Sequence, residues 1–296
     1  MRITDVHTHG LHGYDTRTTD VEHLLKIAEI QGAQGVSAVV LTLYPGAIRV
    51  MRESMALVNR AMQKQEASGS QKPAEAAPES TTPARILGVH LEGPFLNPAK
   101  CGALNALTFI NPSEGSLLQL LEGYEELVKI ITVAPELEGA PKLIKSICGK
   151  GIIASMGHSE ATYQEAEAGA RAGARGITHL FNAMSGFHHR EPGLAGFGLL
   201  DPDIYVEVIA DPYHLHPATL EFIFKTKNPD RILLISDTVK ESTPFTKGMG
   251  VADMHGRLLG GSMSIAESAQ RMKELGFNPD AVNACITENP ERYLRG

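Results

Sequence analysis

The chain lacks a long apolar run, a signal-peptide pattern and an excess of basic residues. No apolar run approaches the roughly 20 residues of a membrane-spanning helix. At the N-terminus, Met1-Arg2-Ile3 leads directly into what reads as a strand, without the regions of a signal peptide. The net charge of −7 argues against nucleic acid as a main partner. We therefore expect neither a membrane nor a nucleic acid among its partners.

Cysteine is also scarce. The chain has three cysteines, Cys101, Cys148 and Cys285, and no two of them form a CxxC pair. Cysteine usage of this kind predicts reduced thiols and a cytoplasmic location. We interpret all three as small buried apolar residues.

The rest of the composition is typical of a globular protein, with 43% hydrophobic and 21% charged residues. A length of 296 residues is enough for one large domain with a sizeable core. Segments with the apolar pattern of strands mostly alternate with segments that have the pattern of helices. The expected strands are 2–6, 35–42, 85–91, 127–133, 152–156, 176–179, 204–210 and 231–236.

Eight strands that alternate with helices predict a (β/α)8 barrel, the TIM-type fold, with residues 1–296 as a single domain. A doubly wound open sheet is the alternative, but no G-x-G-x-x-G follows the first strand. Residues 66–83, rich in Ala, Ser, Pro, Glu and Thr, read as a polar loop or disordered insertion. Residues 185–198 read as a glycine-rich loop, and 279–293 as one closing helix.

A glutamate and two histidines stand at the ends of three expected strands. A carboxylate at the tip of a buried strand, such as Glu92 after the apolar run ending at Leu91, is costly unless something pairs with it. His158 and His179 end two later strands in the same way. One Glu with two His suits a metal site that keeps one position open.

The first and last expected strands carry further polar residues at their ends. His7 and His9 follow the first strand at positions i and i+2, so both rings share one face. Asp237 follows the last strand. Because a barrel gathers the C-terminal ends of its strands, we expect all of these side chains to meet.

These motifs resemble those of the N-acetylglucosamine-6-phosphate deacetylases of the amidohydrolase superfamily. The two most specific stretches are HLEGPF at 90–95 and THLFNAM at 178–184. The matches follow the family's order along the whole chain. The other matching stretches are VAPE at 133–136, Gly157-His158-Ser159-x-Ala161-Thr162, HREPG at 189–193, Ile209-Ala210-Asp211-x-x-His214 and Ser236-Asp237.

The resemblance implies a metal-dependent amidohydrolase barrel and assigns roles to its residues. Glu92, His158 and His179 would hold a divalent metal, zinc or iron, and His7 and His9 match the His-x-His that some superfamily members use for a second ion. Asp237 would be the general base. The implied substrate-binding residues are Asn182, Ala183, Arg190 and His214. In this family the arginine of the REPG motif, which is Arg190 in this chain, reaches the phosphate bound by a neighbouring subunit. The resemblance therefore also implies a homodimer.

The chain departs from the family in three places. We expect no counterpart of the small β-sandwich that normally accompanies the barrel, since His7 lies close to the first residue and the chain ends soon after the last helix. Leu104 stands where the family has a histidine that polarises the substrate carbonyl, and Leu cannot donate a hydrogen bond. Residues 238–241, Thr-Val-Lys-Glu, replace small residues after Asp237, which changes the expected sugar pocket.

The implied reaction is hydrolysis of the N-acetyl amide of an amino-sugar phosphate, N-acetylglucosamine 6-phosphate, to glucosamine 6-phosphate and acetate. The chemistry of the residues agrees, because a bound metal lowers the pKa of water to about 7 and a nearby carboxylate serves as base and then acid. Arg190 suits bidentate recognition of a phosphate. Two alternatives stay open: a different N-acyl or cyclic amide substrate, and a non-catalytic sugar-phosphate-binding protein.

Overall fold

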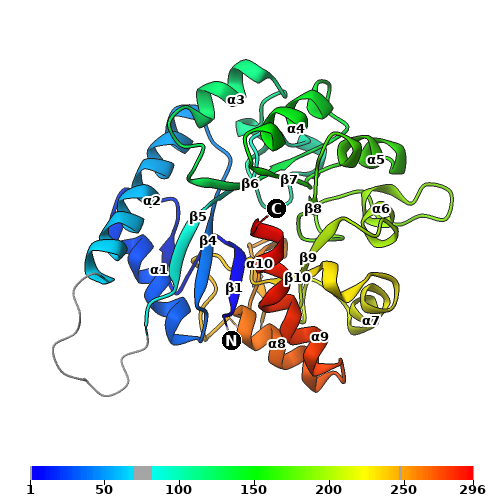
Figure 1. Cartoon of the computed structure of the whole chain (residues 1–296). Helices are drawn as coiled ribbons and strands as arrows, with labels where there is room; N and C mark the ends of the chain where they lie inside the picture. Colours follow the sequence, from blue (N-terminus) through cyan, green and yellow to red (C-terminus); the bar gives the residue numbers. More distant parts are fainter. Residues whose placement is uncertain (1, 70–81, 247–248, 296) are drawn as a thin grey trace.

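Eight parallel strands form one sheet whose spatial order follows the sequence. The computed structural model describes residues 2–69, 82–246 and 249–295, and Figure 1 shows the strands gathered at its centre with helices around them. The strands are β1 (Thr4–Thr8), β4 (Ala38–Leu43), β5 (Arg85–Leu91), β6 (Val128–Val133), β7 (Ile153–Met156), β8 (Gly176–Ile177), β9 (Tyr205–Ile209) and β10 (Ile232–Ile235).

The first and last strands meet and close the sheet into a barrel. Just beyond β10, the backbone N–H of Asp237 donates to the carbonyl of His7 at 2.9 Å, and His9 N–H donates to Thr238 O at 2.8 Å. The expected (β/α)8 barrel is therefore confirmed, and the open doubly wound sheet is wrong.

The helices cover the outside of the barrel, and several begin at the capping residues that the sequence offers. Asp20 caps the first helix, Ser113 the third, and Thr162 with Glu165 forms a capping box on the fifth. The helices are α1 (Val21–Ala33), α2 (Ile48–Gly69), α3 (Glu114–Leu121), α4 (Ala140–Gly149), α5 (Tyr163–Arg171), α6 (Gly193–Leu200), α7 (Pro217–Thr226), α8 (Ile265–Glu274), α9 (Pro279–Ile286) and α10 (Glu288–Arg295). Short 3-10 turns occur at Pro98–Lys100, Ala106–Thr108 and Pro229–Arg231.

Two antiparallel pairs lie outside the barrel sheet: β2 (Gly10–Leu11) with β3 (Tyr14–Asp15), and β11 (Val251–Ala252) with β12 (Leu258–Gly260). Within the described residues these pairs are the only other sheets, so no β-sandwich is present among them. The assignment of 1–296 to a single domain stays a prediction. In the same described ranges, no helix is both long enough and apolar enough to cross a membrane.

Apolar side chains fill the interior of the barrel below the strand ends. One cluster joins Val40 of β4, Ile130 of β6 and Leu233 of β10, strands that are not neighbours in the sheet, so these side chains meet inside the barrel. Tyr293 of α10 belongs to this cluster and lies 5.0 Å from the ring of Tyr205, the first residue of β9. Helix α10 therefore covers the end of the barrel at which the strands begin.

Three expected segments differ from the observed fold. Helix α2 continues to Gly69, so residues 66–69 of the expected polar insertion are helical, and residues 70–81 lie outside the described ranges. The expected glycine-rich loop at 185–198 includes the start of α6, all of whose residues except Leu200 are buried. A helix buried on every side shows no polar face, so its sequence carries no amphipathic period. The closing helix is interrupted at Thr287, whose φ of −128° and ψ of −84° end α9.

Candidate active site

The side chains at the strand ends converge on the Glu92 carboxylate, which directly follows β5. Glu92 Oε1 lies 3.0 Å from His158 Nε2 and 3.1 Å from His179 Nε2. The two Nε2 atoms lie 3.1 Å apart. All three residues are buried, and these three ligand atoms are close enough together to hold one ion.

The backbone orients both rings for metal binding. His158 Nδ1 lies 2.8 Å from Lys100 O, and His179 Nδ1 lies 3.2 Å from Asn182 O. A carbonyl oxygen only accepts hydrogen bonds, so the Nδ1 atom of each ring carries the proton and Nε2 is left for a ligand. Two imidazole nitrogens and a carboxylate at these positions fit a divalent metal.

The charge at this point favours a cation. Burial by itself disfavours the charged ring of His179, but the hydrogen bond and charge of Glu92 outweigh it and raise the pKa of His179 to about 9. Burial would likewise raise the pKa of Glu92, yet hydrogen bonds from His158 and other rings hold that pKa well below its usual value. Positive charge is therefore stabilised beside Glu92, as a proton or as a metal ion.

A second group of ligand atoms adjoins the first. His9 Nε2 lies 3.2 Å from Glu92 Oε2, while His7 Nε2 and His9 Nε2 lie 3.3 Å and 3.6 Å from Asp237 Oδ1. His7, His9 and Asp237 are close enough together to hold an ion of their own. Glu92 Oε1 faces His158 and His179 and also lies 3.6 Å from His7 Nε2, while Oε2 faces His9, so Glu92 borders both groups of ligand atoms.

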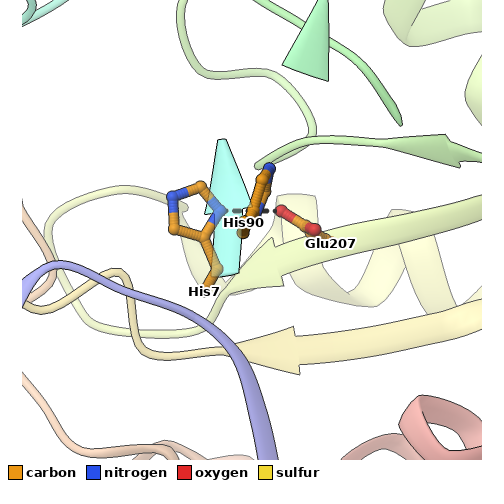
Figure 2. A group of neighbouring side chains, drawn as sticks. All are labelled: His7, His90 and Glu207. Atoms are coloured by element: carbon orange, nitrogen blue, oxygen red, sulfur yellow. Dashed lines mark hydrogen bonds and ion pairs between the residues drawn. The ribbon is translucent and has the colours of Figure 1, made fainter. Parts of the chain in front are cut away.

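Two buried residues that were not predicted as site residues, Glu207 and His90, contact His7. Glu207 of β9 accepts from His7 Nδ1 at 3.0 Å, which leaves His7 Nε2 free to face Asp237. The ring of His90 lies 4.6 Å from that of His7, with its Nε2 2.7 Å from Thr132 Oγ1. Figure 2 shows the two rings beside the Glu207 carboxylate.

The sequence held a signal for both residues. Glu207 is a carboxylate inside an apolar strand, the same feature that singled out Glu92. His90 precedes Glu92 by two positions in the same strand, and so shares its face. Burial is the largest influence on both groups, raising the pKa of Glu207 to about 7 and lowering that of His90 to about 3.

Three residues of the ligand clusters adopt left-handed backbone conformations. The φ angles are +47° at His158, +32° at His179 and +47° at Asp237. Non-glycine residues rarely adopt positive φ, and such strain persists only where the surrounding structure imposes it. At each of the three positions the chain turns sharply at the end of a strand and aims its side chain at Glu92 or His7.

A cavity of about 260 Å³ opens above the cluster of ligands. Asn182, Ala183 and His214, expected to bind substrate, line it, as does Leu104. The other residues that line the cavity are His9, Tyr44, Glu92, Gly102, Ala103, His158, His179, Ile209, Asp237, Arg257, Leu258, Leu259 and Gly260.

His214 is held by a neighbouring carboxylate. Its Nδ1 lies 3.0 Å from both oxygens of Asp211, which also accepts from the backbone N–H of Tyr213 at 2.9 Å and of Ser262 at 2.9 Å. Asp211 therefore ties the loop after β9 to the segment that follows β12. Asp211 belongs to one of the motifs that match the family, and its role becomes clear only from these contacts.

Two expected features lie away from the cavity. Arg190 is exposed on the loop before α6, where its Nη1 lies 3.1 Å from His189 Nε2. Residues 238–241 do not line the cavity either, because Thr238 bonds to Thr8 and the backbone of Lys240 accepts from Gly13. The change expected in the sugar pocket from residues 238–241 stays a prediction.

A closed barrel of eight parallel strands, with His, Glu and Asp ligands gathered where the strands end, defines a metal-dependent hydrolase of the amidohydrolase class. No protein-family model matches the chain. The N-acetylglucosamine-6-phosphate deacetylase of Bacillus subtilis (strain 168) is 33% identical over 293 residues, which span 92% of this chain and 69% of that protein. The N-acetylgalactosamine-6-phosphate deacetylase of Escherichia coli O157:H7 is 30% identical over 303 residues, spanning 98% of this chain and 76% of that protein.

Solved structures agree with these relatives. The N-acetyl-D-glucosamine-6-phosphate deacetylase of Mycobacterium smegmatis superposes with a TM-score of 0.84 at 26% identity, over 99% of this chain and 78% of that one. The N-acetylglucosamine-6-phosphate deacetylase of Thermotoga maritima gives 0.85 at 26% identity, with the same coverage. The chain belongs to the N-acetylglucosamine-6-phosphate deacetylase family.

Proposed function

We propose that this chain hydrolyses the acetyl amide of N-acetylglucosamine 6-phosphate to give glucosamine 6-phosphate and acetate. The observation that carries the proposal is the convergence of Glu92, His158 and His179 with Asp237 at the floor of the cavity. Family membership supports the choice of substrate, and so does the Mycobacterium smegmatis structure, in which a variant deacetylase is bound to N-acetyl-D-glucosamine-6-phosphate.

Glu92, His158 and His179 would hold the main metal, and His7 with His9 a second ion. Two imidazoles and a carboxylate suit zinc, and imidazole nitrogen also suits iron. When bound, the metal supplies Lewis-acid activation of water and of the amide carbonyl. Leu104 lines the cavity without a hydrogen-bond donor, so it adds nothing to that polarisation.

Asp237 would accept a proton from the attacking water and deliver it to the leaving amine. Its carboxylate lines the cavity beside His7 and His9, where it faces both these histidines and the space in which a substrate would bind. Asn182, the backbone of Ala183 and His214 would orient the sugar. Asp211 fixes the ring of His214 through Nδ1, which leaves the Nε2 edge for a sugar oxygen.

We propose a homodimer, which the exposed position of Arg190 supports. This residue does not line the cavity of its own chain, and in a dimer it would reach the phosphate bound by the second copy. Light scattering would test the dimer, and Arg190→Ala would then weaken binding of the 6-phosphate. The cytoplasmic location expected from the unpaired cysteines also stays a prediction.

A panel of N-acyl substrates tests the reaction. We expect acetate release from N-acetylglucosamine 6-phosphate at the highest kcat/KM, and very little from cyclic amides. Asp237→Asn is the control, because it should slow turnover strongly without removing the metal held by Glu92, His158 and His179. Absence of acetate release from every N-acetyl sugar phosphate, with substrate binding unaffected by Asp237→Asn, would instead support a non-catalytic binding protein.

A second candidate substrate is N-acetylgalactosamine 6-phosphate. The alignment with the N-acetylgalactosamine-6-phosphate deacetylase of Escherichia coli O157:H7 spans 98% of this chain. In addition, Leu104 lines the cavity at the position where the family has a histidine. The two sugars differ only in the orientation of one hydroxyl group. The same panel separates them through the ratio of their kcat/KM values.

A further inference from the structure

We propose that Arg257 is an anion-binding residue of the cavity and selects substrates that carry a phosphate. The proposal rests on the proposed function, and it assigns to the chain itself a phosphate contact independent of Arg190. Among the described residues that line the cavity, Arg257 is the only lysine or arginine.

The position of Arg257 suits the far end of a sugar phosphate. The metal-binding side chains at the floor are no more than 5% exposed, whereas the side chain of Arg257 is 55% exposed and so lies at the rim. In an N-acetylated sugar 6-phosphate the amide and the phosphate lie at opposite ends of the molecule. A substrate with its amide at the floor would therefore place its anion toward the rim.

The donors of the guanidinium are only partly used. Arg257 Nε and Nη2 both lie 3.1 Å from Asp253 Oδ2, and Nη1 donates to Gly102 O at 3.2 Å. A guanidinium has five N–H groups, so one remains on each terminal nitrogen. A guanidinium is a planar fork of donors, and these remaining N–H groups can donate to oxygens of a phosphate.

The β11–β12 hairpin holds this arginine in place. Asp253 Oδ1 accepts from the backbone N–H of His255 at 2.9 Å and of Arg257 at 3.0 Å, while Asp253 N–H donates to Arg257 O at 2.9 Å. The same carboxylate thus fixes both the turn and the guanidinium. The side chain is oriented before any ligand arrives, which reduces the entropy lost on binding.

Kinetics of Arg257→Met on a phosphorylated and an unphosphorylated substrate test the assignment. For N-acetylglucosamine 6-phosphate we expect KM to rise about 10- to 100-fold with little change in kcat, as for loss of a charge-assisted hydrogen bond. For N-acetylglucosamine itself, kcat/KM should stay within about twofold of wild type. Arg257→Lys should recover part of the affinity, since it keeps the charge but loses the fork.

Arg171→Met is the matched control. Arg171 is an exposed arginine of α5 that is also paired with a carboxylate, so its loss changes the net charge equally without touching the cavity. Its KM for the 6-phosphate should equal that of wild type. An equal fall in kcat/KM for both substrates in Arg257→Met would overturn the proposal, because it would show that Arg257 serves only to brace the loop at Gly102.

Binding of inorganic phosphate separates this proposal from the proposed function. Calorimetry on the metal-loaded protein should show phosphate affinity reduced about 10-fold or more in Arg257→Met and unchanged in Arg171→Met. That result would support the anion site even if no N-acetyl sugar were hydrolysed. Equal phosphate affinity in wild type and Arg257→Met would refute the site even if the deacetylase activity were present.

Discussion

The Nε2 atoms of His158 and His179 lie 3.1 Å apart, and each faces the same oxygen of Glu92. The opposite nitrogen of each ring is occupied by a backbone carbonyl, Lys100 O and Asn182 O. Neither ring can turn away without losing that hydrogen bond. The protein therefore holds a cation-binding geometry through its backbone, and removal of the cation leaves like-charged rings or unpaired nitrogens together.

Removal of metal should therefore lower both activity and stability. Dialysis against a chelator is expected to abolish turnover and to lower the melting temperature by roughly 10 °C. A drop of this size is expected when a ligand whose concentration was far above its dissociation constant is removed. Scanning calorimetry with elemental analysis measures both. Zinc or iron should restore them. In His158→Ala the chelator should leave the melting temperature nearly unchanged, and an equal drop there would contradict a site at these residues.

Glu207→Gln should weaken the ion held by His7. The glutamine can still accept from His7 Nδ1, but it removes the negative charge behind the ring. We expect the dissociation constant of the second ion to rise about 10- to 100-fold, while the ion at Glu92 is retained. Metal titration followed by elemental analysis gives the stoichiometry. Glu160→Gln, at an exposed carboxylate, is the control, and unchanged affinity in Glu207→Gln would refute the role.

Asp237→Asn should slow the chemical step. An amide cannot accept the proton that the carboxylate takes, so kcat should fall about 10²- to 10⁴-fold. KM and the metal bound at Glu92 should change little, because His158 and His179 are oriented by the backbone at Lys100 and Asn182 and not by Asp237. Steady-state kinetics and metal analysis of the same preparation check both points. A fall in kcat that extra metal restores would show that Asp237 acts as a ligand rather than a base.

Asp211 should make stability depend on pH in the acid range. Burial would raise its pKa, but hydrogen bonds from His214 and from the backbone of His214 and Ser262 outweigh burial and lower the pKa from 3.8 to about 2. A lowered folded-state pKa stabilises the protein above about pH 4, and that contribution is lost as pH falls toward 2. It amounts to about 2 kcal/mol at neutral pH.

Calorimetry of wild type and Asp211→Asn across pH tests this. The variant should be less stable at pH 7, and the gap in melting temperature should narrow as the pH falls from 5 to 3. A gap that stayed constant over that range would show that the carboxylate charge contributes nothing. Asp201→Asn, at a carboxylate with other partners, serves as the control.

The strands were predictable because each is a short apolar run ending in a turn residue or a polar ligand. The number of strands predicted the barrel. The barrel in turn predicted that Glu92, His158 and His179 would lie close together. The helix at Gly193 was missed because its residues are buried on nearly all sides and leave no polar stripe in the sequence. The break at Thr287 depends on tertiary packing that no local pattern records.

The finer geometry of the site was beyond the sequence for a different reason. The left-handed backbone at His158, His179 and Asp237 goes against the preference of each residue and exists because neighbouring strands impose it. Arg257 was overlooked because it belongs to none of the matching motifs and reaches the cavity from the β11–β12 hairpin. Glu207 and His90, by contrast, carried a readable signal, since a buried charge or imidazole inside a strand needs a partner.

Because β1 closes against the segment after β10, the residues of the site come together in a fixed order during synthesis. Glu92, His158 and His179 have all left the ribosome by the time His179 emerges, whereas Asp237 follows seconds later at ordinary rates of translation. His7 and His9, although made first, cannot meet Asp237 until that residue has been made. The nascent chain thus contains the ligands of its main metal before it contains its general base.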